Sequence, residues 1–492
     1  MIDLVLPIGV LLAGSLVVYI VARASHNKAL TGFVTILALA VCGYVIELLQ
    51  TGDPMMGIPS GAEALFATFK LTPLGVFMAW ASLGLSAIVA LFSVGYMSEH
   101  NIGKYYALLL MMTAGMVGIG IANDLFNLFV MFELMSLASF ALVAFEDEWE
   151  PVEAGMKYVL LSAMGSMIAL LGIILVFAYT GTLNFELLNT AAIAGKMRPD
   201  LLLGCAALMI GGFGVKAAIV PMHTWLPDAH SAAPSGISAM LSGMVISAGL
   251  ITLIKALTVL HGLELGLVLV LLAVVTMFAG NMLAIWQTDL KRMLAYSSIA
   301  NIGYILVGIG VAFAVPEIAG FEGFRGGLYH ILNHAIMKGG AFLCAGAIIT
   351  AVGSRDFKEI AGIGRKLPVV GVAFVVFALA LAGAPPLNGF ISKLFICLAA
   401  MKLPVWGFTI TVIVVLNSLL SLFYYVPAMN KILLARGEEM TEKVKATSGL
   451  PASITLAIFI LALLTLGLGI APQYGLDIVD PAAHYLAVLL KQ

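Results

Sequence analysis

The chain alternates long apolar segments with short polar connections. Each segment has about 20 residues or more, the length that an α-helix needs to cross the hydrocarbon core of a bilayer. Counting them predicts about fourteen membrane-spanning helices and an all-α polytopic membrane protein. The segments lie near residues 2–22, 29–50, 72–97, 104–122, 124–145, 154–180, 201–226, 236–260, 265–286, 294–315, 326–352, 367–400, 404–431 and 450–471.

Two of these segments contain prolines where a helix would otherwise continue. Pro221 interrupts the seventh segment, and Pro385 and Pro386 interrupt the twelfth. Proline removes a backbone hydrogen bond and clashes with the preceding turn, so both segments are predicted to be broken helices. In a bilayer such breaks persist only against protein or water. Because the breaks lie five segments apart, an odd offset, they predict two inverted five-helix repeats.

The repeats divide the chain into four parts. Residues 1–103 would form three N-terminal helices, and 104–262 the first five-helix repeat. Residues 263–435 would form the second, inverted repeat, and 436–492 a C-terminal helix and tail. Each repeat would then contain one broken helix.

Lysine and arginine are distributed unequally over the polar connections. Most of the 24 fall in one set of alternating connections, which faces the cytoplasm under the positive-inside rule. Both termini would then lie on the outer side of a cell membrane. The N-terminal segment has no basic start and no small-residue cleavage site, so we interpret it as a retained helix.

The composition excludes several classes of protein. The chain is 62% hydrophobic and only 10% charged, which excludes a soluble protein. Its net charge of −2 argues against a nucleic-acid partner. Cys42, Cys205, Cys344 and Cys397 lie apart in apolar segments, whereas zinc and iron–sulfur sites need clustered thiolates. We therefore predict no metal and no redox active site on this chain.

Two opposite charges are predicted to lie near the middle of the membrane. Glu133 and Lys216 both fall inside apolar segments. A lone amine in the hydrocarbon core costs about 2.5–3.5 kcal/mol, and a buried carboxylate needs a partner or takes up a proton. The two segments run in the same direction, so we predict that the residues pair. The pair would belong to an ion pathway or, alternatively, would lock two helices together as a static ion pair.

Further titratable residues follow in the second half. His330, His334 and Lys338 are spaced i, i+4 and i+8, so they share one helix face. They form either a proton wire or polar glue between helices. Lys393 follows the second break near mid-membrane and would release the ion. Lys255 lies near the end of its segment, where snorkelling to the interface explains it equally well.

The sequence around these charges resembles a known family. The run GFGVKAAIVPMHTWLPDAHSAAPSGISAMLSG is similar to the signature of antiporter-like membrane subunits, as are FELMSL, HILNHAIMKGGAFL and AGAPPLNGFISKLF. The family includes three large proton-pumping subunits of respiratory complex I and the A and D subunits of Mrp-type sodium/proton antiporters. Related subunits occur in energy-converting membrane-bound hydrogenases and formate hydrogenlyase. The resemblance covers about residues 70–435. Length and Lys393 look most like the Mrp D subunit or its counterpart in such a hydrogenase.

The resemblance implies a role for each buried charge. Glu133 and Lys216 would form the input-side pair, and Lys255 would be the second lysine of the chain. The histidines and Lys338 would connect the two halves, and Lys393 would pass the ion to the external side.

The predicted function is proton translocation by an antiporter-like subunit of a multisubunit energy-converting complex, such as a membrane-bound hydrogenase or a relative of complex I. The expected partners are other membrane subunits and a peripheral redox arm, which would hold any iron–sulfur or nickel–iron centres. Sodium is the alternative ion. The Mrp D subunit of a sodium/proton antiporter, a stand-alone solute transporter and a structural subunit with static ion pairs are the alternative functions.

Overall fold

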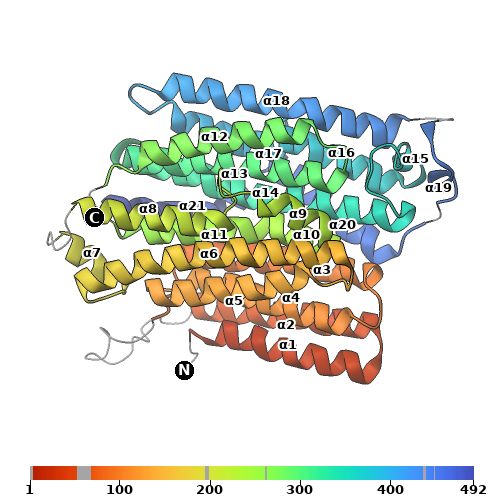
Figure 1. The fold of residues 1–492 in the computed structure, drawn as a ribbon, viewed down its shortest axis with the longest axis horizontal. Helices are drawn as coiled ribbons and strands as arrows, with labels where there is room; N and C mark the ends of the chain where they lie inside the picture. Colours follow the sequence, from red (N-terminus) through yellow and green to blue (C-terminus); the bar gives the residue numbers. More distant parts are fainter. Residues whose placement is uncertain are drawn as a thin grey trace.

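A computed structural model describes residues 4–51, 68–193, 199–260, 263–435, 439–447 and 449–491. Over these ranges the chain forms a bundle of long helices that run side by side (Figure 1). Twelve helices in the described ranges are long and apolar enough to cross a membrane. The predicted all-α polytopic membrane architecture is therefore confirmed. The count of fourteen is not confirmed, because the seventh and twelfth predicted segments are each divided into two shorter helices.

The first half of the chain occupies one side of the bundle, with the N-terminal helices at its edge (Figure 1). Its helices are α1 (Leu6–Ser25), α2 (Lys28–Thr51), α3 (Pro73–Tyr96), α4 (Ile102–Ile121), α5 (Leu125–Val143), α6 (Trp149–Thr180), α7 (Phe185–Ile193), α8 (Pro199–Lys216), α9 (Trp225–Ala232), α10 (Ser235–Met240), η1 (Leu241–Val245) and α11 (Ile246–Thr258).

The second half lies on the other side, with α18 at the opposite edge (Figure 1). Its helices are α12 (Gly266–Ile285), α13 (Leu290–Ala314), α14 (Pro316–Val352), α15 (Ile363–Lys366), α16 (Pro368–Ala382), α17 (Asn388–Ala400), α18 (Gly407–Leu434), α19 (Glu442–Lys445), α20 (Ala452–Ile470) and α21 (Gln473–Lys491).

Side-chain caps mark where several spans begin. At the start of α5, the Asp124 carboxylate accepts a hydrogen bond from the Asn127 backbone N–H, 2.7 Å away. Asp289 accepts one from the Arg292 N–H in the same way at the start of α13, at 2.9 Å. These caps satisfy amide groups that have no partner within the helix.

Both predicted helix breaks are present. α8 ends at Lys216 and α9 begins at Trp225, with Pro221 in the non-helical connection. The carbonyl of Val215 accepts hydrogen bonds from the Ala218 backbone N–H at 3.1 Å and from the Trp225 indole N–H at 2.7 Å. The Val220 N–H donates to the hydroxyl of Thr276 in α12, at 3.1 Å. Polar groups from the surrounding protein thus replace the missing helical bonds, as burial in a membrane protein requires.

The eighth predicted span, Ser235–Thr258, contains a turn of π-helix that the sequence pattern did not predict. Residues Leu241–Val245 form this turn, η1, between α10 and α11. Gly243 lies against the backbone of Ala335 in α14, where an added Cβ would come within 3.2 Å of it. The close approach explains the need for glycine and brings η1 next to His334. π-turns inside α-helices occur frequently at functional sites.

The predicted C-terminal tail is a helix. α21 follows α20 after a short break, and the two lie one after the other along α14. The Tyr329 hydroxyl donates to the carbonyl of Leu468 near the end of α20, at 3.1 Å. Arg325 pairs with Asp480 of α21 at 2.8 Å. α21 has polar residues on one face, so it lacks the continuous apolar run on which the span count relied.

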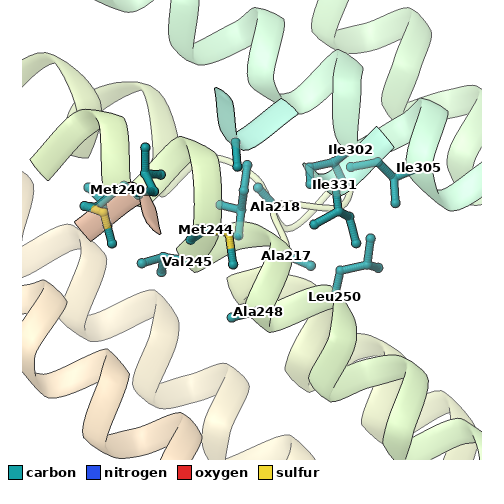
Figure 2. Packing of buried hydrophobic residues seen from close by; sticks show 14 of the residues in the cluster. Ala217, Ala218, Met240, Met244, Val245, Ala248, Leu250, Ile302, Ile305 and Ile331 are labelled. Carbon is teal, nitrogen blue, oxygen red and sulfur yellow. The ribbon is translucent and has the colours of Figure 1, made fainter. Parts of the chain in front are cut away.

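Apolar side chains fill the space where the two halves meet (Figure 2). We call this set the apolar layer, and every labelled member of it is 0% exposed. The layer includes Ala217, which follows Lys216, and Ile331, which follows His330. It therefore contains residues that are next in sequence to buried charges of both halves. Its labelled members are Ala217, Ala218, Met240, Met244, Val245, Ala248, Leu250, Ile302, Ile305 and Ile331.

Candidate functional site: buried charges along the middle of the bundle

Glu133 of α5 and Lys216 of α8 do not form the direct ion pair that the sequence predicts. No nitrogen–oxygen contact within ion-pair distance joins these two described residues. The Lys216 ammonium instead donates to the hydroxyl of Tyr158 in α6, at 2.7 Å. Glu133 accepts a hydrogen bond from the Ser166 hydroxyl, also in α6, at 2.5 Å. Helix α6 thus supplies a hydroxyl to each charge and keeps the two charges apart.

Aromatic rings enclose the Lys216 ammonium. Its nitrogen lies 4.3 Å from the ring centroid of Tyr158 and 4.5 Å from that of Phe140. Trp225 stacks on Tyr158 with centroids 4.0 Å apart. Lys216 is 1% exposed. A desolvated cation over an aromatic face gains about 2 kcal/mol, so these rings and the hydroxyl stabilise a charge that has no direct counter-ion.

The histidines and Lys338 of α14 face a second row of polar side chains on α13. That row is Ser297, Asn301 and Tyr304. The Lys338 ammonium donates to the Ser297 hydroxyl and to the carbonyl of Leu294, the latter at 2.8 Å. These contacts hold Lys338 at one end of the paired rows.

His330 connects these rows to α17. One ring nitrogen lies 3.1 Å from the Asn301 side-chain oxygen, and the other lies 2.8 Å from the hydroxyl of Ser392. Ser392 precedes Lys393 in α17. The ring of Tyr304 lies near both residues, 6.0 Å from the His330 ring and 4.2 Å from the Lys393 nitrogen. The structure therefore places His330 and Lys393 around one shared tyrosine.

His334 lies between His330 and Lys338 and has no protein partner for either ring nitrogen. Its ring lies 6.4 Å from that of His330. Buried polar atoms in native proteins almost always have a partner, either protein or ordered water. His334 is therefore a place where water can enter the row.

Lys393 is anchored to the second helix break. Its ammonium donates to the carbonyl of Leu381 in the last turn of α16, at 2.8 Å, and to the Ser418 hydroxyl of α18, at 2.8 Å. The position suits a cation because the C-terminal end of a helix carries partial negative charge. Lys393 also lines a cavity of about 410 Å³ between α16, α17 and α18.

Lys255 is separate from this chain of contacts. It lies in the last turn of α11 and donates to the carbonyls of Ile119, Gly120 and Ala122, at 2.9, 2.9 and 2.6 Å. All three carbonyls lie at the C-terminal end of α4. The side chain is buried, so it does not snorkel to an exposed position within this chain. The contacts are those of a cation that caps a helix.

Sequence reasoning missed the hydroxyl and amide groups that surround the charges. Tyr158 and Ser166 of α6, and Asn301 and Tyr304 of α13, were not identified as site residues. A signal was available on α13, because Ser297, Asn301 and Tyr304 are spaced i, i+4 and i+7 in an apolar span, which places them on one helix face. In the described part of the chain, no group of three or more His, Cys, Asp or Glu residues could hold a metal ion.

Comparisons with known proteins identify the family of the chain. Residues 122–421 match the family described as NADH:quinone oxidoreductase/Mrp antiporter, TM. The chain is 34% identical over 442 residues to F(420)H(2) dehydrogenase subunit N of Methanosarcina mazei, covering 85% of each chain. It is 31% identical over 467 residues to NADH-quinone oxidoreductase subunit N of Moorella thermoacetica, covering 93% of this chain and 92% of that one.

Solved structures show the same fold. A chain in the structure of the membrane-bound sulfane sulfur reductase, an archaeal respiratory membrane complex, superposes with a TM-score of 0.85 at 27% identity. The superposition covers 99% of this chain and 98% of that chain. Together with the family match over more than half of the sequence, these likenesses show that the chain is a member of the NADH:quinone oxidoreductase/Mrp antiporter family of transmembrane subunits.

Proposed function

We propose that this chain is a proton-translocating membrane subunit of a multisubunit energy-converting complex. The observation that carries the proposal is the row of buried titratable groups from Lys338 through His334 and His330 to Lys393. Ionisable residues inside a membrane are expensive and mark ion or proton pathways. The subunits N of F(420)H(2) dehydrogenase and NADH-quinone oxidoreductase, to which the chain is similar, support this reading.

The proton moves along the hydrogen bonds of His330 and through water at His334, which has no protein partner, and between Ser392 and Lys393. Lys338 and His334 hold it at one end of the row, and His330 passes it through the hydroxyl of Ser392 towards Lys393. Imidazole suits this task because it accepts a proton on one nitrogen and releases one from the other. Lys393 then gives the proton to the cavity that it lines.

Lys216 and Glu133 control the row without belonging to it. Among the described residues, no side-chain hydrogen bond joins the partners of Lys216, Ser139 and Tyr158, to those of His330, Asn301 and Ser392. Charges nevertheless interact strongly across a medium of low dielectric constant. Movement of Glu133 towards or away from Lys216 therefore changes the electrostatic potential at the His330 row. Lys255 caps α4 instead of relaying a proton.

The partners follow from this assignment. The chain carries out no redox step; other membrane subunits and a peripheral arm supply the driving reaction and hold any iron–sulfur or nickel–iron centres. The transported ion is the proton, because the row consists of proton-exchanging groups, whereas sodium prefers oxygen ligands. The end of the bundle that carries most of the lysines and arginines faces the cytoplasm, and both termini lie outside.

The proposal is tested by replacing Lys216 or Lys393 with alanine and measuring proton movement. The purified complex in liposomes should assemble with either variant and lose proton translocation about hundredfold, the scale of removing a positioned proton-transfer group. Lys402→Ala is the matched control, because Lys402 is an exposed lysine that pairs with Glu322 at 2.5 Å. It should translocate protons like the unmodified complex.

Two results would contradict the proposal. If Lys216→Ala and Lys393→Ala both translocate protons normally and only lower thermal stability, the buried charges merely lock helices together. If sodium movement is lost while proton movement is retained, the ion is sodium. Stability must be measured in parallel, because removing one member of a buried charged set can cost about 3–5 kcal/mol.

A further inference from the structure

His230 of α9 is a buried histidine to which the proposed pathway gives no role. Its side chain is 0% exposed, and neither ring nitrogen has a protein partner. The neighbouring Ser231 hydroxyl is also buried and without a protein partner. Three neighbouring buried polar atoms without a protein hydrogen-bond partner are unusual, because most buried polar atoms bond to protein or to ordered water.

The position of His230 extends the row on α14. Its ring stacks on Phe342, with centroids 4.7 Å apart, and Phe342 lies one helical turn beyond Lys338. His230 and His334 are electrostatic neighbours, and Lys338 acts on both. The four titratable groups therefore follow one another along α14 over about 18 Å, taking 1.5 Å per residue from 330 to 342.

The other charged group that acts on His230 is Lys291 of α13. Lys291 is buried, and its ammonium donates to the carbonyl of Ala233 at 2.5 Å. Arg355 holds the same connection by donating to the carbonyl of Ser231 at 2.7 Å. Burial tends to lower the pKa of Arg355, but the carboxylates of Glu150 and Asp289 outweigh it and raise this pKa above its ordinary value. Arg355 therefore holds the backbone and does not carry protons.

The start of α9 connects His230 to the surface. Asp228, two residues earlier, pairs with Arg292 at 2.7 Å and with Lys157 at 3.2 Å, and its side chain is 27% exposed. This ion-pair cluster joins the start of α9 to α6 and α13. His230 thus lies between a partly exposed charged cluster and the buried groups His334 and Lys338.

We propose that His230 is the intake residue of the second half, which loads the Lys338–His334–His330 row from the Asp228 end. One ring nitrogen accepts a proton from water at the Asp228 side while the other releases its proton towards His334 and Lys338, so the imidazole returns to the neutral form. The row is then loaded without a proton crossing the apolar layer from Lys216. This inference rests on the proposed function and adds the source of the proton to it.

The test uses His230→Phe in the purified complex in liposomes. Phenylalanine keeps the stack on Phe342 but removes both nitrogens, so the complex should assemble with unchanged thermal stability and lose proton translocation about tenfold or more. His484→Phe is the matched control. His484 is an exposed histidine of α21 that also packs on a phenylalanine, Phe321, with centroids 6.5 Å apart, and its replacement should have no effect.

A second variant separates proton transfer from packing. His230→Ala should also lose translocation, and added imidazole should restore part of it by occupying the space of the missing ring. A purely structural histidine would not give this rescue. His230→Ala also keeps the test decisive if His230→Phe fails to assemble.

Failure of this inference can be distinguished from failure of the proposed function. If His230→Phe translocates protons normally while Lys393→Ala does not, the row is loaded elsewhere and His230 is a packing residue. The same holds if His230→Ala loses translocation and imidazole restores none of it. If Lys216→Ala and Lys393→Ala are also fully active, the proposed function itself is wrong.

Discussion

Lys216 and Lys393 both lie beside a broken helix, but their surroundings differ. At the first break, the Trp225 indole donates to the carbonyl of Val215, and Lys216 donates to side-chain hydroxyls among aromatic rings. At the second break, Lys393 itself satisfies the free carbonyl of Leu381 and borders a cavity. Similar breaks in the two halves therefore hold their lysines in different ways.

The difference suggests a division of work. Lys216 is enclosed by rings, so its charge acts on the rest of the molecule mainly through the electric field. Lys393 borders a cavity, where the proposed mechanism has it exchange its proton with water. We therefore propose that the side chains around each break decide whether its lysine controls the pathway or conducts protons.

The largest expected difference between the two lysines is their accessibility. Lys216→Cys and Lys393→Cys, each made with Cys397→Ser because Cys397 lines the same cavity, should react with a small cationic thiol reagent at very different rates. We expect Cys at 393 to react about a hundredfold faster, because reaction at 216 requires local opening of the structure. Mass spectrometry of the labelled chain measures both rates. Equal rates would remove the distinction between an enclosed and an open lysine.

Lys255 provides the next test, because it resembles Lys393 in being anchored to carbonyls and in lining a cavity, here of about 580 Å³. Lys255→Met leaves three carbonyls at the end of α4 without their charged donor. We expect a loss of stability of about 2 kcal/mol, the scale of a hydrogen bond to a charged group, measured by thermal unfolding of the complex. Proton translocation per folded complex should be retained. Its loss would make Lys255 a relay, the role that the family resemblance implies.

The tyrosines near the two lysines should also differ. Tyr158→Phe removes the hydroxyl that accepts from Lys216 at 2.7 Å, so we expect about a tenfold fall in proton translocation, from a hydrogen bond worth about 1.5 kcal/mol. Tyr304→Phe keeps the ring that lies 4.2 Å from the Lys393 nitrogen and should change translocation less than about twofold. A larger fall in translocation for Tyr304→Phe than for Tyr158→Phe would show that the tyrosine hydroxyl matters at Lys393 and the ring at Lys216.

The smallest effect is expected for Ser418→Ala. Lys393 loses one hydrogen bond but keeps the carbonyl of Leu381. Water in the adjacent cavity can replace the hydroxyl at little cost, so translocation should fall about threefold at most. A loss as large as that of Tyr158→Phe would mean that the cavity does not supply water to Lys393.

The sequence predicted what depends on local spacing. The i, i+4, i+8 pattern placed His330, His334 and Lys338 on one face, and the prolines located both breaks. Which groups meet across helices was harder to predict. Depth in the membrane placed Glu133 and Lys216 at a similar level, but the rotation of each helix about its axis decides whether they touch, and Tyr158 and Ser166 of α6 make those contacts instead.

Other features of the structure depend on contacts between helices, which the spacing of residues along the sequence does not predict. The π-turn at Leu241–Val245 lies where Gly243 packs closely against Leu85 and the backbone of Ala335. α21 is amphipathic, and Asp480 on its polar face forms an ion pair with Arg325 of α14. The unpartnered nitrogens of His230 are also not visible in the sequence, because a lone histidine in a span resembles any other buried histidine until its neighbours are known.

In the proposed mechanism, the apolar layer between the halves makes the molecule behave like a charged capacitor. Ile302, Ile305 and Ile331 provide an insulating sheet, and Lys216 and the histidine row act as its two plates. Charging one plate raises the energy of a like charge on the other, yet no current flows through the sheet. A complex built in this way can transmit work between its halves while the membrane stays sealed against leakage when the driving reaction stops.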